Sequence, residues 1–202
     1  MIKIDDFINK LKKSGLQFCT GVPDSLLKEL CFEFEKSYKK NHVVASNEGA
    51  AVALGIGYHL KTQKVPIIYL QNSGFGNMIN PLISLADPMV FKIPLFIIMG
   101  WRGEMNPKIK DEPQHLTQGK LTEKFLKDLK IKYKIVTKNS NYSKDIKQLE
   151  MYAKKNNRIV CLLVKKNVFK KINKNQTVKN KYKLLKREIF LRYIVKNLSR
   201  RF

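Results

Sequence analysis

Residues 65–77, VPIIYLQNSGFGN, contain the pattern that decides the fold. The first seven residues are almost wholly apolar, and the next six bring two asparagines and the glycines Gly74 and Gly76. An apolar run of this length that ends in such residues is typical of a buried strand followed by a tight turn. The residues that follow, up to about Ala86, have helical spacing, so the segment predicts a strand, a turn and a helix in succession.

The same alternation of strand and helix recurs along the chain. Further apolar runs predict strands at residues 16–22, 42–45, 93–100, 132–136 and 158–164. Segments with apolar residues at helical spacing lie between them. This order predicts an α/β fold, a three-layer sandwich with a six-stranded, mostly parallel sheet and helices on both faces. Ligands of such sheets bind at the carboxyl ends of strands, where most polar motifs of this chain fall.

Length and composition predict one domain with a basic extension. The 202 residues, 44% of them hydrophobic, suit an α/β domain over residues 1–165. Residues 166–182 are predicted to be a charged linker, and residues 183–202 one more amphipathic helix. The three cysteines lie far apart in the sequence, so free thiols in a reducing compartment are expected. Without a signal-peptide pattern or an apolar run of about 20 residues, the chain is expected in the cytoplasm.

The net charge of +24 raises the question of a polyanionic partner. Residues 165–202 hold fourteen Lys and Arg but a single acid, Glu188. Because Lys, Asn and Ile are abundant along the whole chain, a biased composition explains the charge better than nucleic-acid binding does. Binding of nucleic acid or an anionic membrane through this tail stays the alternative hypothesis.

Glu48 is the first candidate for chemistry. It follows a predicted buried strand and opens a helix of small residues, GAAVALGIGYHL, where the helix N-terminus stabilises a carboxylate. The small residues allow a ligand ring or another subunit to approach closely. Glu48 is therefore either an ordinary helix-start acid or a proton relay on a close-packed surface. The same helix predicts an apolar surface for a homo- or hetero-oligomer.

Other polar motifs also fall at predicted strand ends. Arg102 directly follows a strong strand and is placed either to clamp a doubly charged anion or to pair with Glu104. His115 lies in the polar stretch 103–119, predicted to be a functional loop, and is either a proton-transfer residue or a solvated one. The glycines of NSGFGN fit neither a P-loop nor a dinucleotide-binding motif. No metal-ligand spacing is found, and no metal site is predicted within this chain.

Five stretches together resemble a known family. They are GVPDSLLKEL (21–30), SNEGAAVALGIGYHL (46–60), YLQNSGFGNMINPLISLADP (69–88), IPLFIIMGWRGE (93–104) and DEPQHLTQGK (111–120). In order and spacing the set is similar to phosphonopyruvate decarboxylase over about residues 15–165. Sulfopyruvate decarboxylase, which is often made as two separate subunits, is the close alternative. The resemblance implies the six-stranded pyrimidine-binding domain of thiamine-diphosphate-dependent decarboxylases.

The resemblance also implies a role for each motif. Glu48 corresponds to the glutamate that hydrogen-bonds the aminopyrimidine of thiamine diphosphate and activates the cofactor. Asp24 corresponds to a loop acid that faces the reacting centre, and His115 falls where such enzymes keep proton-transfer residues. The other predicted contacts are Asn72, Ser73 and Gln118 with the cofactor, and Arg102 and Ser25 with the substrate.

A second domain is implied as well. In this family another domain holds the diphosphate through Mg²⁺ with a Gly-Asp-Gly run, which this sequence lacks. The predicted activity is therefore decarboxylation of 3-phosphonopyruvate to phosphonoacetaldehyde and CO2, with a diphosphate-binding domain supplied in trans. Residues 183–202 resemble the first helix of that domain. The chain is expected to be a subunit of a two-gene enzyme, with a split gene or a non-catalytic remnant as alternatives.

Overall fold

A computed structural model describes residues 1–104, 111–171 and 187–198 of the chain. Residues Met1–Lys171 form one compact unit, and beyond it the structure describes the helix α7 (Arg187–Leu198). The strands are β1 (Cys19–Gly21), β2 (His42–Val44), β3 (Ile67–Gln71), β4 (Phe96–Gly100), β5 (Lys132–Val136) and β6 (Val160–Val164). The helices of the compact unit are α1 (Ile4–Lys13), α2 (Lys28–Tyr38), η1 (Lys39–Asn41), α3 (Glu48–Thr62), η2 (Asn72–Gly74), α4 (Phe75–Pro81), η3 (Leu82–Ala86), α5 (Pro113–Asp128) and α6 (Tyr142–Asn156).

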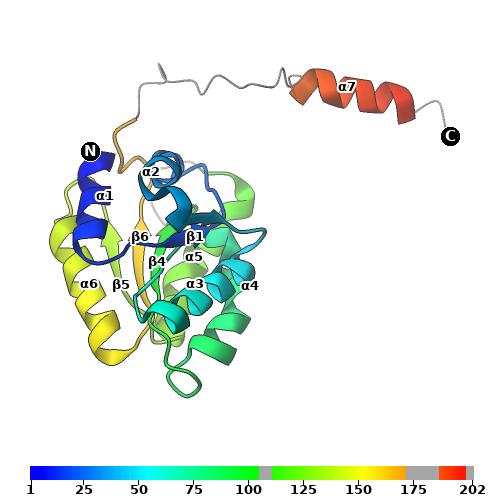
Figure 1. Ribbon diagram of the computed structural model, residues 1–202. Helices are drawn as coiled ribbons and strands as arrows, with labels where there is room; N and C mark the ends of the chain where they lie inside the picture. The colour runs from blue at the N-terminus through cyan, green and yellow to red at the C-terminus, as the bar shows by residue number, and fades with distance from the viewer. Residues whose placement is uncertain (105–110, 172–186, 199–202) are drawn as a thin grey trace. The chain divides into compact units, whose positions relative to one another are not determined.

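The six strands form one parallel sheet in the order β2-β1-β3-β4-β6-β5 (Figure 1). The prediction of a six-stranded α/β sheet is confirmed. Every residue of β4 and β6 is buried because these strands lie inside the sheet and are covered on both faces. The prediction of a buried strand at 42–45 was wrong in part: β2 is an edge strand, and Val44 is 57% exposed.

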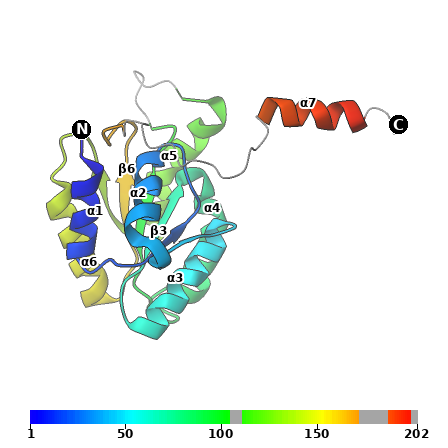
Figure 2. The ribbon, with the colours of Figure 1, turned by 45° about the horizontal axis from the view of Figure 1, so that its top comes forward.

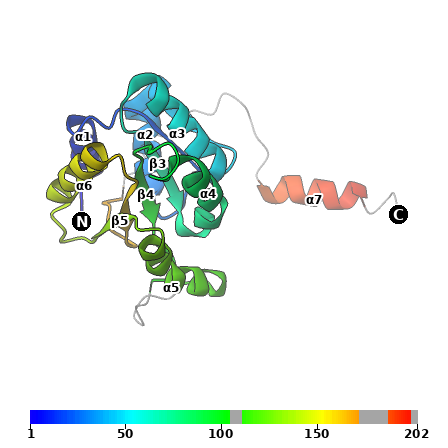
Figure 3. The same cartoon turned by 90° about the horizontal axis from the view of Figure 1, so that it is seen from below.

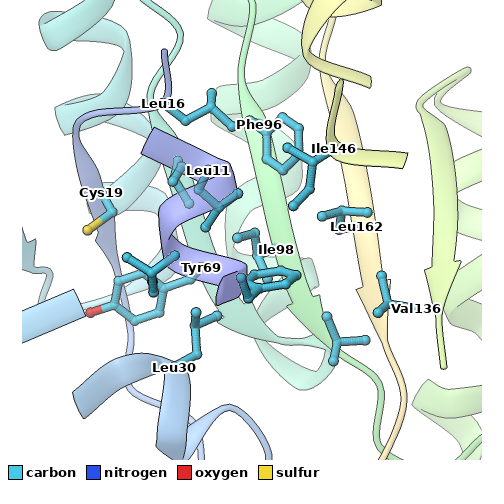
Figure 4. Packing of buried hydrophobic residues seen from close by; sticks show 14 of the residues in the cluster. Leu11, Leu16, Cys19, Leu30, Tyr69, Phe96, Ile98, Val136, Ile146 and Leu162 are labelled. Atoms are coloured by element: carbon cyan, nitrogen blue, oxygen red, sulfur yellow. The ribbon is translucent and has the colours of Figure 1, made fainter. Parts of the chain in front are cut away.

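The helices cover both faces of the sheet, which gives three layers (Figures 2 and 3). One core joins α1, α2 and α6 to one face, and a second core joins α3, α4 and α5 to the other. Successive residues of a strand point to opposite faces, so in β3 Ile67 and Tyr69 enter the first core while Ile68 and Leu70 enter the second. Figure 4 shows Tyr69 in the first core with Leu30 of α2 nearby.

Two predicted boundaries differ from the structure. The stretch 103–119 is not wholly a loop, because α5 begins at Pro113, a residue whose fixed φ suits the first turn of a helix. The predicted linker starts at residue 166, yet Val168 and Phe169 are buried in the first core, and Phe169 pairs with Ile2 in a parallel bridge. The compact unit therefore includes the start of that stretch, whereas residues 172–182 lie outside the described residues.

The C-terminal helix was predicted over residues 183–202. The described helix α7 covers Arg187–Leu198 of that range, and residues 183–186 and 199–202 lie outside the described residues. Across the described parts of the chain, no helix has both the length and the apolar character needed to span a membrane.

Candidate functional site

The parallel sheet brings the predicted site residues to one edge. Glu48 follows β2, Asp24 follows β1, Asn72 follows β3 and Arg102 follows β4, and these four strands are consecutive neighbours. Adjacent strands lie about 4.8 Å apart, so residues distant in the sequence meet at the carboxyl edge. The site predicted from separate motifs is thus one continuous region of the fold.

Glu48 is the first residue of α3, and local sequence explains why the helix begins there. Asn47 is the N-cap, and its side-chain oxygen accepts a hydrogen bond from the backbone N–H of Ala50 at 2.9 Å. A carboxylate in the first turn lies close to the unpaired N–H groups at the positive end of the helix.

Contacts from the segment after β3 fix the Glu48 carboxylate. Nδ2 of Asn77 donates a hydrogen bond to Oε2 of Glu48 at 2.8 Å. The other oxygen, Oε1, lies so close to Gly74 that a Cβ at residue 74 would overlap it. Glu48 is half-buried rather than fully buried, so its carboxylate is held in place and still accessible.

Asp24 is the buried acid of the site, with a relative exposure of 6%. Its carboxylate accepts hydrogen bonds from the backbone N–H groups of Leu26, at 3.1 Å, and Leu27, at 3.2 Å, which shapes the turn before α2. Burial raises the pKa of Asp24, and these hydrogen bonds and the charge of Arg102 lower it by a smaller amount. Gly100 of β4 leaves the space that the carboxylate fills.

Arg102 pairs with Asp111 and not with Glu104. Its Nε lies 3.0 Å from both carboxylate oxygens, and Nη2 lies 2.5 Å from Oδ1. The guanidinium holds the pKa of the Asp111 carboxyl well below its usual range. Nη1 donates to Oγ of Ser25 at 3.3 Å, so Arg102 also connects the loops after β1 and β4. The alternative partner, Glu104, is buried and instead pairs with Lys165 at 2.6 Å.

Asn72 joins three segments of the site through a buried side chain. Its Nδ2 donates to the carbonyl oxygen of Arg102 and to Oγ1 of Thr122, both at 2.9 Å. Its Oδ1 accepts from the backbone N–H of Arg102 at 3.0 Å. The side chain is therefore engaged with protein groups and fixes β3, the end of β4 and α5 relative to one another.

His115 and Gln118 lie on the first turns of α5. Gly103, at φ +68°, and Gly119 let the segment after β4 touch this helix, since a Cβ at either position would overlap backbone atoms of the other segment. His115 and Gln118 are both half-buried. Nδ1 of His115 is a buried atom without a hydrogen-bond partner among the described residues. Because α5 packs on η2, His115 belongs to the same edge as Gly74 and Glu48.

A hollow of about 310 Å³ opens beside the loop after β1. Its lining includes Asp24, Ser25, Cys31, Phe32, His42 and Val44. Ser73, which follows β3 and does not line this hollow, is exposed and accepts a hydrogen bond from Gln71 at 2.8 Å. Over residues 1–104, 111–171 and 187–198, no group of three or more His, Cys, Asp or Glu side chains is placed to hold a metal ion.

Comparison with known proteins shows the family to which the chain belongs. Residues 4–125 match the model "Thiamine pyrophosphate enzyme, N-terminal TPP binding domain". This chain belongs to the thiamine pyrophosphate enzyme family. The matched range contains the strands β1 to β4 and every predicted site residue.

Relatives of two kinds support the family. Phosphonopyruvate decarboxylase of Streptomyces hygroscopicus is 37% identical over 122 residues, which are 60% of this chain and 29% of that protein. Sulfopyruvate decarboxylase subunit alpha of Methanocaldococcus jannaschii is 34% identical over 156 residues, which are 77% of this chain and 88% of that protein. The chain thus spans less than a third of the phosphonopyruvate decarboxylases, but most of the length of the alpha subunit.

A solved structure supports the fold. Benzoylformate decarboxylase from Polynucleobacter necessarius superposes with a TM-score of 0.61 at 19% identity, over 89% of this chain and 33% of that one. The likeness shows that the fold of this chain is also present within that larger protein.

The residues around Glu48 fit the aminopyrimidine of thiamine diphosphate. The carboxylate can accept a hydrogen bond from a ring nitrogen, and it is half-exposed at a helix N-terminus. Gly74 carries no side chain that would displace the carboxylate, and Glu48 itself is only half-buried. A flat ring therefore has access to this surface.

Sequence reasoning missed three residues of this region. Asn77 holds Glu48, Asp111 holds Arg102, and Thr122 accepts a hydrogen bond from Asn72. Asn77 and Asp111 stand inside quoted motifs, so a signal was present in the sequence. Their partners, however, lie on other segments, and only the fold shows them.

Proposed function

We propose that this chain is the pyrimidine-binding half of a thiamine-diphosphate-dependent 2-oxoacid decarboxylase. The observation that supports this most directly is the half-buried Glu48 carboxylate, which is fixed by Asn77 and packs against Gly74. Family membership and the decarboxylase relatives agree with it. The activity is a proposal because the chain spans only part of its full-length relatives.

Each residue of this chain has a defined task in the proposal. When bound, the cofactor supplies an electron sink for loss of CO2 from the substrate. Glu48 accepts a hydrogen bond from the ring nitrogen of the aminopyrimidine and so sets where a proton resides on that ring. Asp24, whose pKa is raised by burial, is a carboxyl group placed at the carboxyl edge to exchange a proton. His115 provides a second group able to carry a proton, while Asn72, Ser73 and Gln118 shape the cofactor surface.

The proposed substrate is a 2-oxoacid with an anionic group on its third carbon. We favour 3-phosphonopyruvate, converted to phosphonoacetaldehyde and CO2 in a phosphonate pathway, with sulfopyruvate as the alternative. Relatives named for both substrates have similar identity to this chain. Arg102 and Ser25 are the proposed contacts of the anionic group, since they meet at the edge beside Asp24.

The proposal includes a diphosphate-binding partner, which would also carry Mg²⁺. Similarity to proteins named alpha subunits supports a multi-subunit enzyme. Leu54 and Leu60 on α3 and Ile83 on η3 are exposed by 42%, 59% and 46%, and exposed apolar side chains favour an interface. We place this oligomeric enzyme in the cytoplasm.

Reconstitution tests the proposal. The chain is mixed with a purified partner chain that carries a Gly-Asp-Gly run, and CO2 release from phosphonopyruvate and sulfopyruvate is measured with and without thiamine diphosphate and Mg²⁺. We expect cofactor-dependent release that Glu48→Gln lowers by about 100-fold or more. Asp128→Asn removes an exposed carboxylate at the far end of α5 and should leave the rate unchanged. Equal rates for Glu48→Gln and the wild type would contradict the proposal.

A further inference from the structure

The charge of Arg102 is cancelled within this chain. Asp111 contacts the guanidinium through both carboxylate oxygens, and the side chains of Arg102 and Asp111 are 18% and 4% exposed. The carboxylate is fixed independently of Arg102, because the backbone N–H groups of Gly103 and Glu112 both donate to it at 2.9 Å. The pair is therefore a built feature of the site and not a transient surface contact.

Arg102 nevertheless keeps capacity to bind an anion. A guanidinium has five N–H groups, and each terminal nitrogen here uses one of its two. Each therefore retains one N–H without a partner among the described residues, next to the hydroxyl of Ser25. The site thus offers hydrogen-bond donors without a net positive charge, and Asp24 and Glu112 add negative charge nearby.

Hydrogen-bond donors and net charge act differently on two otherwise similar anions, sulfonate and phosphonate. Sulfonate and phosphonate groups both present three oxygens, but a sulfonate carries one negative charge, whereas a phosphonate carries up to two near neutral pH. Hydrogen-bond donors serve both groups alike. Net charge favours the dianion, because Coulomb attraction scales with the charge of the ligand.

We infer that Asp111 is a specificity-determining residue, which cancels the charge of Arg102 and so removes the advantage of a doubly charged over a singly charged substrate. This inference rests on the proposed function. Asp111 would influence the choice between phosphonate and sulfonate through its contact with Arg102, without contact to the reacting carbon. Removal of the Asp111 charge should favour the dianionic substrate.

The experiment compares the two substrates in the reconstituted enzyme. In Asp111→Asn and Asp111→Ala, the ratio of kcat/KM for phosphonopyruvate to that for sulfopyruvate should rise about tenfold over the wild-type ratio, the effect of one unit charge at a partly hydrated contact. The ratio in these variants should also rise with pH as the phosphonate loses its second proton. Glu112→Gln removes a neighbouring exposed charge that does not bond the guanidinium, and should change the ratio less than twofold.

A binding measurement on the chain alone separates this inference from the proposed function. Methylphosphonate and methanesulfonate are titrated into wild type and Asp111→Asn while the Arg102 Nε–H resonance is followed by NMR. A gain for methylphosphonate only in the variant supports the inference even if no partner restores decarboxylation. An active enzyme overturns the inference if the substrate ratio in both Asp111 variants stays within twofold of the wild-type ratio. The inference is also overturned if Asp111→Asn, like the wild type, binds methylphosphonate no more tightly than methanesulfonate.

Discussion

The side-chain amide of Asn77 donates a 2.8 Å hydrogen bond to the carboxylate of Glu48, which joins the start of α4 to the start of α3. The two residues follow β3 and β2, strands that are separated in the sheet by β1. The orientation of Glu48 is therefore set by a segment that lies nearly thirty residues further along the chain.

Gly74 should tolerate no side chain without loss of function. In Gly74→Ala the new methyl group would overlap the Glu48 carboxylate and displace it. We expect cofactor-dependent activity to fall by about 100-fold, the effect of misplacing a proton-transfer group. Gly76→Ala is the matched control, since its Cβ meets open space, and Ala in a helix should stabilise the protein by about 0.5–1 kcal/mol. Equal activity of the two variants would show that Glu48 needs no clearance at residue 74.

Asn77 should act as a positioning residue for Glu48. Asn77→Ala removes the donor and leaves the carboxylate free to rotate, so activity should fall about tenfold with a small change in stability. Asn77→Asp places a second carboxylate beside Glu48, and like charges disfavour ionisation, so the loss should be larger. Asn80→Ala, an exposed position one turn further on, is the control. Thermal melts and cofactor titrations of the three variants check the order.

Asn72 should contribute mainly to stability. Asn72→Ala removes the three hydrogen bonds of a buried side chain and leaves the backbone N–H of Arg102 without its side-chain acceptor. We expect the free energy of unfolding to fall by about 2–4 kcal/mol, from urea titrations. Ser73→Ala, at an exposed neighbouring position, should change it by less than about 0.5 kcal/mol. A loss as small as that of Ser73→Ala would contradict the role of Asn72 in joining the three segments.

Asp24 should make the protein less stable as the pH rises. Burial raises its pKa in the folded state above the unfolded value of about 3.9, so between these two values the folded state binds more protons. The free energy of unfolding then decreases with increasing pH through this window and levels off above the folded pKa. Asp24→Asn lacks this ionisation, so the stability of the wild type relative to the variant should decline from about pH 4 upward. Urea titrations across the pH range test this, and a constant or rising difference would contradict it.

The exposed apolar face of α3 and η3 should bind the partner. Leu54→Lys puts a charge on this face and should weaken association by about tenfold or more without unfolding the chain. Met151→Lys on α6 changes a residue that is 56% exposed on the opposite layer, and should leave association intact. Analytical ultracentrifugation of each variant with the partner measures the difference. Equal weakening by both substitutions would argue against an interface on α3.

Local patterns in the sequence predicted most of the strands and helices, because each of these elements depends on residues that are close together in the sequence. Apolar runs indicated the strands, and the run of small residues after Glu48 indicated α3. The prediction failed for residues 113–119, where α5 begins among polar residues. Leu116 is exposed there, and these first turns contact the rest of the molecule through Gly119 and backbone atoms, whereas the apolar contact of the helix comes later, at Leu126. The burial of β2 was predicted wrongly for a different reason. The burial of a strand depends on whether other strands lie on both sides of it, and its own residues do not show this.

The sequence by itself determined the order of strands and helices, the position of Glu48 at a helix start and the family resemblance, since all three are carried by residue types at fixed spacing. Only the tertiary structure decided what each polar side chain contacts. Arg102 pairs with Asp111 instead of the nearer Glu104, Asn72 is buried between three segments, and Asn77 reaches Glu48. The contacts of Asn72 and Asn77 join segments that follow different strands, and the Arg102–Asp111 pair depends on how the chain folds back after β4, so spacing along the chain does not determine them.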